Sequence, residues 1–157
     1  MKIYVIRHAE TNSNKNGIAG DIEEDINETG VKQCIEAREK IKDLKLDLII
    51  SSPAKRTRHV TEIININNVP VIFDERIIER DLGIYETFNY KDIDRIDFWN
   101  YYPKKYLELE SMKSVCERVN DFIEDIKNKY ADKKILVVTH GGITRGFYCY
   151  SFGIPQD

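Results

Sequence analysis

The sequence has no long apolar run and few cysteines. No apolar stretch approaches the roughly 20 residues that a membrane-spanning helix needs, and the one near the N-terminus is too short for the core of a signal peptide. The cysteines are far apart and include no C-x-x-C pair, which argues against a disulfide framework and a zinc site (Cys34, Cys116 and Cys149). We therefore expect a cytoplasmic protein with reduced thiols and no membrane partner.

An excess of charge of one sign is also missing. The chain carries 24 Lys and Arg against 27 Asp and Glu, a formal net charge of −3, and its basic residues are spread along the sequence. Nucleic-acid-binding surfaces concentrate basic residues in a patch, so we expect no nucleic-acid partner. A locally cationic pocket is still compatible with this balance, because summed charge says little about one cleft. With 157 residues and no repeat or linker, the chain is expected to form one domain over 1–157.

Short apolar runs alternate along the chain with helical patterns. Four runs rich in β-branched residues predict strands covered on both faces, at 2–6, 47–51, 69–73 and 134–139. Helices are predicted by apolar spacing over 30–44 and 114–130, by Pro53 at the start of 53–66, and after the last strand. Ser114-x-x-Glu117 is a capping-box pattern at the start of 114–130. The order predicts an α/β fold, a three-layer α/β/α sandwich around a mainly parallel sheet.

One segment breaks this alternation. Eight of the sixteen aromatic residues fall between Tyr85 and Tyr106, with a spacing that fits neither one strand nor one helix. We predict a small aromatic-rich cap inserted at approximately 81–110. Most of its aromatic side chains should fix the cap on the core, with one or two lining a ligand cleft.

Polar residues follow three of the four predicted strands. Arg7 and His8 end the first, Arg56 lies one helical turn beyond the second, and His140-Gly141-Gly142 follows the fourth. In open parallel sheets, ligands bind at the carboxyl ends of the strands. Arginine guanidinium groups can donate two parallel hydrogen bonds to phosphate oxygens. The backbone N–H groups at Gly141, where a helix is expected to start, would also bind an anion. The sequence therefore predicts a phosphate site at this edge.

Four motifs in order, "RHAETNSN", "SSPAKRTR", "ERDLG" and "VVTHGG", resemble those of the histidine phosphatase superfamily, also called the phosphoglycerate mutase-like family. The resemblance implies that His8 is the nucleophile that takes the phosphoryl group. It also implies that Glu79 is the proton donor and that Arg7, Arg56 and His140, joined by Asn14, bind phosphate oxygens.

The chemistry of these residue types agrees with those roles. An imidazole attacks phosphorus only when neutral, and nearby guanidinium groups disfavour its protonated form. The same cations stabilise the transferring phosphoryl group, and a positioned acid helps an alkoxide to leave. This scheme needs no metal, and we expect no cofactor.

The sequence also departs from the family pattern. Ala9 replaces a glycine in the first motif, while Ile18 and Gly20 stand where Arg and Gln are common. We expect a phosphatase that hydrolyses a small phosphate ester, with α-ribazole phosphate among the substrates left open. A phosphoglycerate mutase, or a catalytically weak phospho-ligand binding module, remains the alternative. The sequence does not predict the oligomeric state.

Overall fold

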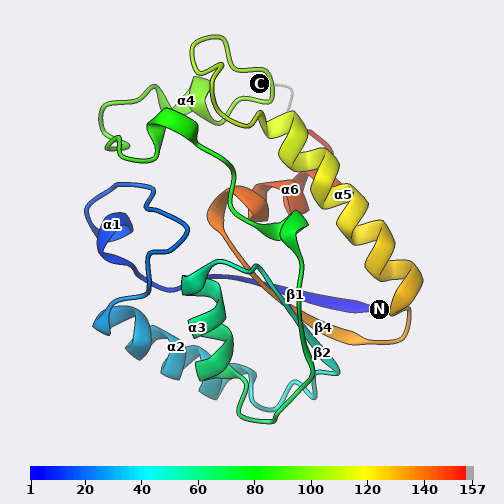
Figure 1. The fold of residues 1–157 in the computed structure, drawn as a ribbon. Helices are drawn as coiled ribbons and strands as arrows, with labels where there is room; N and C mark the ends of the chain where they lie inside the picture. Colours follow the sequence, from blue (N-terminus) through cyan, green and yellow to red (C-terminus); the bar gives the residue numbers. More distant parts are fainter. Residues whose placement is uncertain (155–157) are drawn as a thin grey trace.

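The computed structural model describes residues 1–154 and shows a sheet with helices packed on both sides (Figure 1). The elements in chain order are β1 (Lys2–Arg7), α1 (Asn12–Lys15), α2 (Glu28–Ile41), β2 (Leu48–Ser51), α3 (Lys55–Ile64), β3 (Val71–Phe73), η1 (Glu75–Ile77), η2 (Gly83–Tyr85), α4 (Arg95–Phe98), α5 (Met112–Lys129), β4 (Lys134–Thr139) and α6 (Gly141–Phe152).

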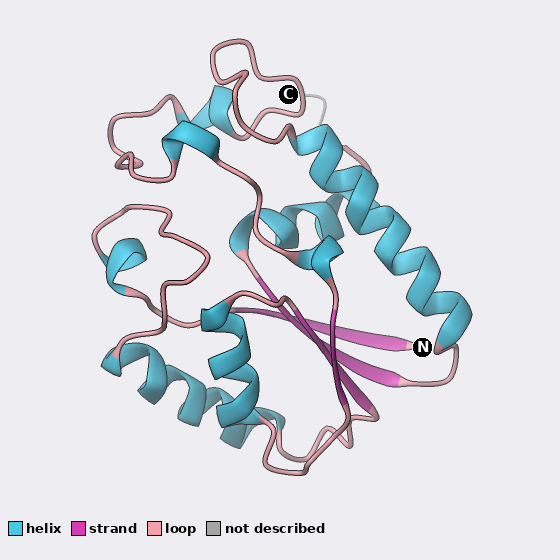
Figure 2. Ribbon diagram, in the orientation of Figure 1, coloured by secondary structure: helices cyan, strands magenta, loops and turns pink. Residues whose placement is uncertain are grey.

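The sheet has the order β1-β4-β2-β3, and every neighbouring pair of strands is parallel. Helices α2 and α3 cover one face, and α5 and α6 cover the other (Figure 2). The predicted α/β/α sandwich is confirmed, and each predicted strand is present. The first and last strands lie side by side, so residues more than 130 positions apart meet at the carboxyl edge of the sheet.

The core consists of two apolar layers because side chains of β4 alternate between the faces of the sheet. Val137 packs in the layer under α5, with Val115 and Phe122. Val138 points to the opposite layer and packs with Val60 of α3. Full burial of one such side chain contributes about 1.5–3 kcal/mol to folding, so both helical layers are held mainly by apolar contact.

The start of α5 differs from the prediction. Its N-cap is Ser111, whose hydroxyl accepts a hydrogen bond from the Ser114 backbone N–H at 3.1 Å. Ser114 lies inside the helix, and its own hydroxyl donates to the Glu110 carboxylate at 3.0 Å. The predicted capping box was wrong because a second serine, three residues earlier, offers the same chemistry where the chain is still extended.

The segment 81–110 folds over the carboxyl edge of the sheet, and we call it the cap. It contains the short helices η2 and α4 around a third apolar cluster, in which Leu82, Phe98 and Leu109 are buried. The Glu110 N–H donates to the Asp81 carbonyl at 2.8 Å, so the two ends of the cap lie together. An aromatic cluster therefore replaces regular backbone pairing as the main support of this segment.

Two further expectations concern the thiols and the membrane. Cys34 and Cys116 are buried and Cys149 is half-buried, and all three are free thiols. None of the helices within residues 1–154 has the length and apolar character that crossing a membrane requires.

Candidate active site

The register of the sheet brings two histidines together. Arg7 of β1 pairs with Thr139 of β4, so His8 and His140 leave adjacent strands at the same level. The His8 backbone N–H donates to the Thr139 carbonyl at 2.8 Å. The centres of the two imidazole rings are 5.2 Å apart. Parallel pairing of the first and last strands therefore builds the centre of the site.

His8 is held as a neutral imidazole with one nitrogen free. Its Nδ1 lies 2.8 Å from the Ala9 carbonyl oxygen, which can only accept, so Nδ1 carries the proton and Nε2 keeps its lone pair. The side chain is buried, with 7% of the residue's surface exposed. Burial and, next, the positive charge of Arg56 lower the pKa of His8 to about 3. An unprotonated Nε2 is the form that can act as a nucleophile.

His140 is fully buried behind this ring. Its Nε2 lies 2.7 Å from the hydroxyl of Ser52, the residue that directly follows the neighbouring strand β2. Burial and the charge of Arg56 lower the pKa of His140 to about 2. Its Nδ1 has no hydrogen-bond partner within residues 1–154. A buried nitrogen without a partner is costly in a folded protein, which is typical of a site that a ligand completes.

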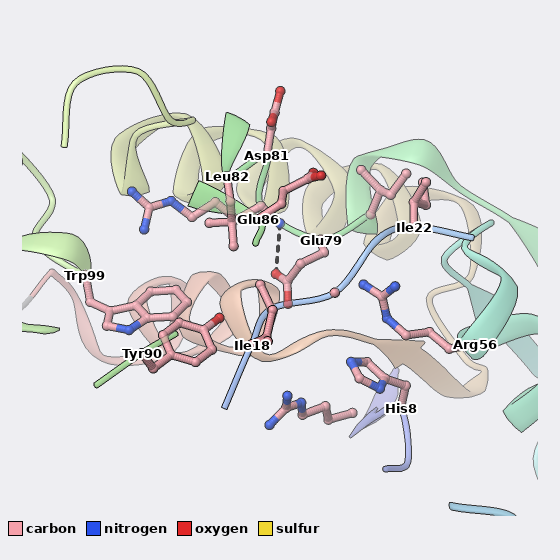
Figure 3. Close-up of a pocket in the computed structure, with 15 residues that line it drawn as sticks. His8, Ile18, Ile22, Arg56, Glu79, Asp81, Leu82, Glu86, Tyr90 and Trp99 are labelled. Atoms are coloured by element: carbon pink, nitrogen blue, oxygen red, sulfur yellow. Dashed lines mark hydrogen bonds between the residues drawn. The ribbon is translucent and has the colours of Figure 1, made fainter. Parts of the chain in front are cut away.

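Two arginines supply positive charge beside His8. Arg56, in the first turn of α3, is 3% exposed, and its Nη1 donates to the Asp21 carbonyl at 2.6 Å. Burial lowers the Arg56 pKa, whereas the charge of Glu79 raises it, and the guanidinium lies next to the His8 ring (Figure 3). Arg7 lies against Gly141, where an added Cβ would be 3.5 Å from the guanidinium carbon. The cavity is cationic where the two strands end.

Glu79 faces the same cavity from the segment that follows η1. Its Oε1 accepts from the Arg80 backbone N–H at 2.8 Å and from the Gly142 N–H, at the start of α6, at 3.1 Å. Burial raises the Glu79 pKa against the opposing effects of these two bonds and of Arg56. A Cβ at Gly142 would lie 2.5 Å from Glu79 Oε1, so any side chain there would force the carboxyl to move. The carboxyl is thus fixed in position and biased toward its protonated form.

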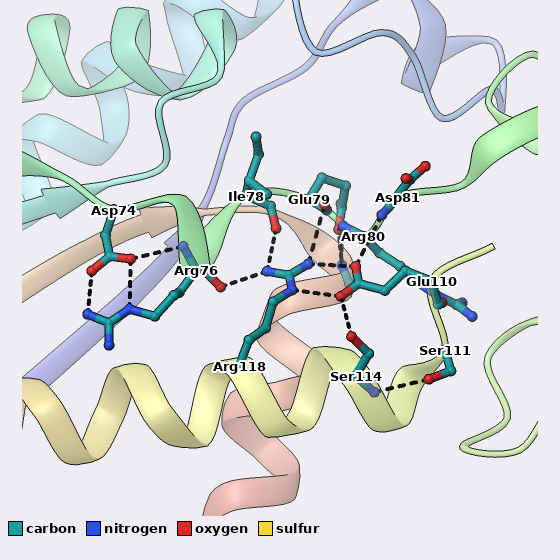
Figure 4. A network of polar contacts seen from close by, with 11 residues as sticks. Asp74, Arg76, Ile78, Glu79, Arg80, Asp81, Glu110, Ser111, Ser114 and Arg118 are labelled. Carbon is teal, nitrogen blue, oxygen red and sulfur yellow. Dashed lines mark hydrogen bonds and ion pairs between the residues drawn. The ribbon is translucent and has the colours of Figure 1, made fainter.

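Arg118 of α5 holds the backbone on which Glu79 lies (Figure 4). Its guanidinium donates to the carbonyls of Arg76 at 2.6 Å and Ile78 at 2.9 Å, and it pairs with the Glu110 carboxylate at 2.8 Å. Sequence reasoning missed this residue. The available signal was a charged side chain within the apolar stripe of α5, one turn before Phe122.

A cavity of about 360 Å³ that opens to solvent is lined by Arg7, His8, Arg56 and Glu79, whereas His140 and Gly141 lie outside its wall. Its wall contains several expected site residues, the two family departures Ile18 and Gly20, and further cap and loop residues (Arg7, His8, Ile18, Ala19, Gly20, Ile22, Arg56, Ile78, Glu79, Arg80, Asp81, Leu82, Glu86, Tyr90 and Trp99). Asn14 is not part of this wall. Its carboxamide oxygen accepts from the Thr11 N–H at 3.1 Å and caps α1. Its role as a phosphate ligand stays a prediction.

The arrangement suits transfer of a phosphoryl group to histidine. It combines a neutral imidazole, two guanidinium groups that match phosphate oxygens, and a carboxyl group with a raised pKa. No three His, Cys, Asp or Glu side chains of residues 1–154 are grouped so that they could hold a metal ion. Fold and site together define a phosphate-handling α/β protein with a histidine at its centre.

Comparison with known proteins agrees with this class. Residues 3–157 match the sequence model of the histidine phosphatase superfamily (branch 1), and the chain belongs to that superfamily. It is 32% identical to phosphoserine phosphatase 1 of Hydrogenobacter thermophilus over 163 residues, covering 98% of this chain and 77% of the relative. It is also 29% identical to a probable phosphoglycerate mutase, GpmB, of Escherichia coli over 150 residues, covering 90% and 70%.

Solved structures share the fold. A putative α-ribazole-5'-P phosphatase of Escherichia coli superposes with a TM-score of 0.82 at 22% identity, over 99% of this chain and 81% of that one. Bacillus stearothermophilus YhfR gives a TM-score of 0.84 at 24% identity over the same shares. The likeness confirms the predicted phosphoglycerate mutase-like architecture.

Proposed function

We propose that the protein is a phosphomonoesterase that hydrolyses a small phosphate ester through a phosphohistidine on His8. The observation that carries the proposal is the state of His8. Its Nδ1 proton is committed to the Ala9 carbonyl, and burial beside Arg56 keeps Nε2 unprotonated. Such an imidazole is a ready nucleophile next to a guanidinium that can hold the phosphate.

In the first step, the phosphate dianion binds Arg7 and Arg56, and His8 Nε2 attacks phosphorus. The N–P bond forms while the bond between phosphorus and the ester oxygen breaks, and that oxygen keeps the electron pair. Glu79 donates its proton to the departing oxygen, and the raised pKa of its carboxyl favours the protonated form that this step requires.

In the second step, the Glu79 carboxylate takes a proton from a water molecule that attacks phosphorus. The N–P bond breaks, its electron pair returns to His8, and inorganic phosphate leaves. The Ser52 hydroxyl can donate to His140 Nε2, which places the remaining proton of that ring on Nδ1. We assign this Nδ1–H, which has no partner within residues 1–154, to a phosphoryl oxygen.

The likeness to GpmB keeps a mutase as the second candidate. A mutase would return the phosphoryl group from His8 to another oxygen of the same substrate. Incubation with 3-phosphoglycerate separates the two, because a phosphatase releases inorganic phosphate and a mutase yields 2-phosphoglycerate.

Trapping the intermediate tests the proposal directly. Acid-labile, base-stable phosphate should appear on the wild-type protein during hydrolysis of p-nitrophenyl phosphate, and His8→Ala should abolish both the adduct and the turnover. His59→Ala is the matched control, because His59 pairs with Asp25 at 2.9 Å and lies outside the cavity wall. Turnover that survives His8→Ala would refute the proposed mechanism.

A further inference from the structure

The cavity divides into two parts of different chemistry. Arg7, His8 and Arg56 line the part at the sheet edge, and this part is cationic. The other part is walled by the cap and by residues 18–22, where aliphatic and aromatic side chains surround two acids, Asp81 and Glu86. A phosphate bound to the arginines leaves its ester oxygen and the attached alcohol toward this second part, which we call the leaving-group subsite.

The leaving-group subsite has no exposed arginine or lysine among the residues that line it. Its arginine is Arg80, whose Nε and Nη1 donate to the carbonyls of Glu110 at 2.5 Å and Phe98 at 2.6 Å. The third nitrogen, Nη2, has no partner within the described chain but is buried away from solvent. The guanidinium also stacks 5.2 Å from the centre of the Phe98 ring. Arg80 is only 2% exposed, so its guanidinium mainly supports the cap, although its charge lies in the cavity wall.

Negative charge accumulates at the open side of this subsite. Glu86 is exposed and lines the cavity, and the nearby charges of Asp21 and Asp81 add to burial in raising the pKa of its carboxyl. Arg56 opposes this effect, but a bound phosphate dianion would engage that arginine. A leaving group with its own carboxylate or phosphate would meet like charge here, whereas the arginine of this wall, Arg80, is 2% exposed and donates to backbone carbonyls.

Tyr90 supplies one neutral hydrogen-bonding group. Figure 3 shows its hydroxyl directed toward the middle of the cavity. The residue is fixed on both sides, because its N–H donates to the Gly17 carbonyl at 2.8 Å and its ring packs edge-on against Phe98. Burial and the charge of Glu79 raise the Tyr90 pKa, so the hydroxyl keeps its proton. It is a fixed donor facing the alcohol side of the ester.

We propose that Tyr90 and Glu86 make the leaving-group subsite selective for phosphomonoesters of small, uncharged, hydroxyl-bearing alcohols. Tyr90 hydrogen-bonds a hydroxyl of the leaving group, and Glu86 repels a second anion. This inference deepens the proposed function and rests on it for the position of the phosphate. It assigns no role in bond breaking to either residue.

Three esters with three-carbon leaving groups test both parts. Glycerol 3-phosphate differs from propyl phosphate by its two hydroxyls, and it differs from 3-phosphoglycerate by a CH₂OH in place of a carboxylate. For wild type we expect kcat/KM to be highest for glycerol 3-phosphate and lowest for 3-phosphoglycerate.

Tyr90→Phe should lower the ratio of kcat/KM for glycerol 3-phosphate to that for propyl phosphate about 3- to 10-fold, the size of one neutral hydrogen bond. Glu86→Gln should raise kcat/KM for 3-phosphoglycerate about 1.5- to 5-fold relative to glycerol 3-phosphate, the size of one exposed charge interaction.

Matched controls come from the same cap. Tyr85→Phe and Glu108→Gln remove a hydroxyl and a charge from residues that do not line the cavity, and they should leave both ratios unchanged. A wild type that prefers 3-phosphoglycerate, or a Tyr90→Phe variant with an unchanged ratio, would overturn the proposal.

Binding separates this inference from the proposed function. The dissociation constants of the three esters for His8→Ala, measured by calorimetry, should follow the same order without any turnover. If wild type hydrolyses none of the esters nor p-nitrophenyl phosphate while this order holds, the phosphatase fails and the leaving-group subsite stands. If hydrolysis occurs and the order is absent, the reverse is true.

Discussion

The two parts of the cavity are supported by different physical devices. At the sheet edge, His8 and His140 are fixed by the parallel register of β1 and β4, and Ser52 by that of β2 and β4. In the cap, Tyr90 and Trp99 are held by edge-on aromatic contacts around Phe98, with little regular backbone pairing. The backbone hydrogen bonds that set a strand register persist when side chains are substituted. The packing of an aromatic cluster, in contrast, changes with each substitution within it. The carboxyl edge of the sheet is therefore suited to hold the groups that act on the phosphoryl group, and the cap is suited to select the leaving group.

This comparison yields a general expectation. Variants at the sheet edge should slow every phosphate ester, because all substrates share the phosphoryl group. Variants in the cap should change the ratio between substrates. Glu79 lies at the junction of the two parts, held by Gly142 of α6 on one side and by Arg118 of α5 beneath its backbone.

Glu79→Gln should give the largest effect of the junction and cap variants. Loss of the proton donor should lower kcat/KM for propyl phosphate, which reports the steps up to formation of the phosphohistidine, about 10²–10⁴-fold, but should lower kcat/KM for p-nitrophenyl phosphate far less, because its phenolate leaves without protonation. Glu79 donates only while protonated and its pKa is raised, so wild-type kcat/KM for propyl phosphate should fall as the pH rises through that pKa. The pH profile of the variant should lack this limb. At the acid side, free His8 becomes protonated near pH 3, so its reactivity should fall there in both proteins.

An equal loss of kcat/KM with both esters would contradict the role of proton donor. Glu75→Gln is a suitable control, because Glu75 lies in η1 close to Glu79 in sequence and does not line the cavity. It should leave the pH profile and the ratio of the two esters unchanged.

Gly142→Ala should lower activity by a smaller factor, because it displaces the Glu79 carboxyl without removing it. The added Cβ would lie 2.5 Å from Glu79 Oε1 and 3.2 Å from the Arg80 Cβ, so the carboxyl must move. Displacing a catalytic group by about 1 Å can cost about 10²-fold, and we expect a 10- to 100-fold lower kcat for alkyl esters. Overpacking should also reduce the free energy of unfolding by about 1–3 kcal/mol. Urea unfolding and steady-state kinetics measure the two effects separately.

Gly141→Ala is the matched control for this change. Its Cβ would meet the Arg7 guanidinium at 3.5 Å, an ordinary contact distance. If both alanine variants lose activity equally, the fit of Glu79 against residue 142 is not what limits catalysis.

The part of the site at the sheet edge could be predicted well from the sequence, and the part in the cap could be predicted only poorly. Continuous apolar runs predicted four strands, and the carboxyl-edge rule then placed His8, Arg56 and His140 together without any side-chain information. The tautomer of His8 depends on one carbonyl at 2.8 Å, which no pattern encodes. In the cap, the aromatic content predicted a compact insert but could not tell Tyr90, which lines the cavity, from Tyr85, which does not. That distinction depends on the direction of the backbone at each residue. Irregular segments have no repeating pattern of apolar residues from which this direction could be predicted.

Phe98→Leu should give the smallest effect, and it tests the comparison itself. Phe98 lies at the centre of the cap cluster, so a smaller side chain loosens Tyr90 and Trp99 and should cost about 1–2 kcal/mol of stability. We expect a two- to fivefold lower ratio of glycerol 3-phosphate to propyl phosphate, with kcat for p-nitrophenyl phosphate nearly unchanged. Phe122→Leu is the matched change in the layer under α5, and it should lower stability without altering the ratio. If Phe122→Leu shifts the ratio as much as Phe98→Leu, selection is a property of the whole molecule and the separation of cap from sheet edge is wrong.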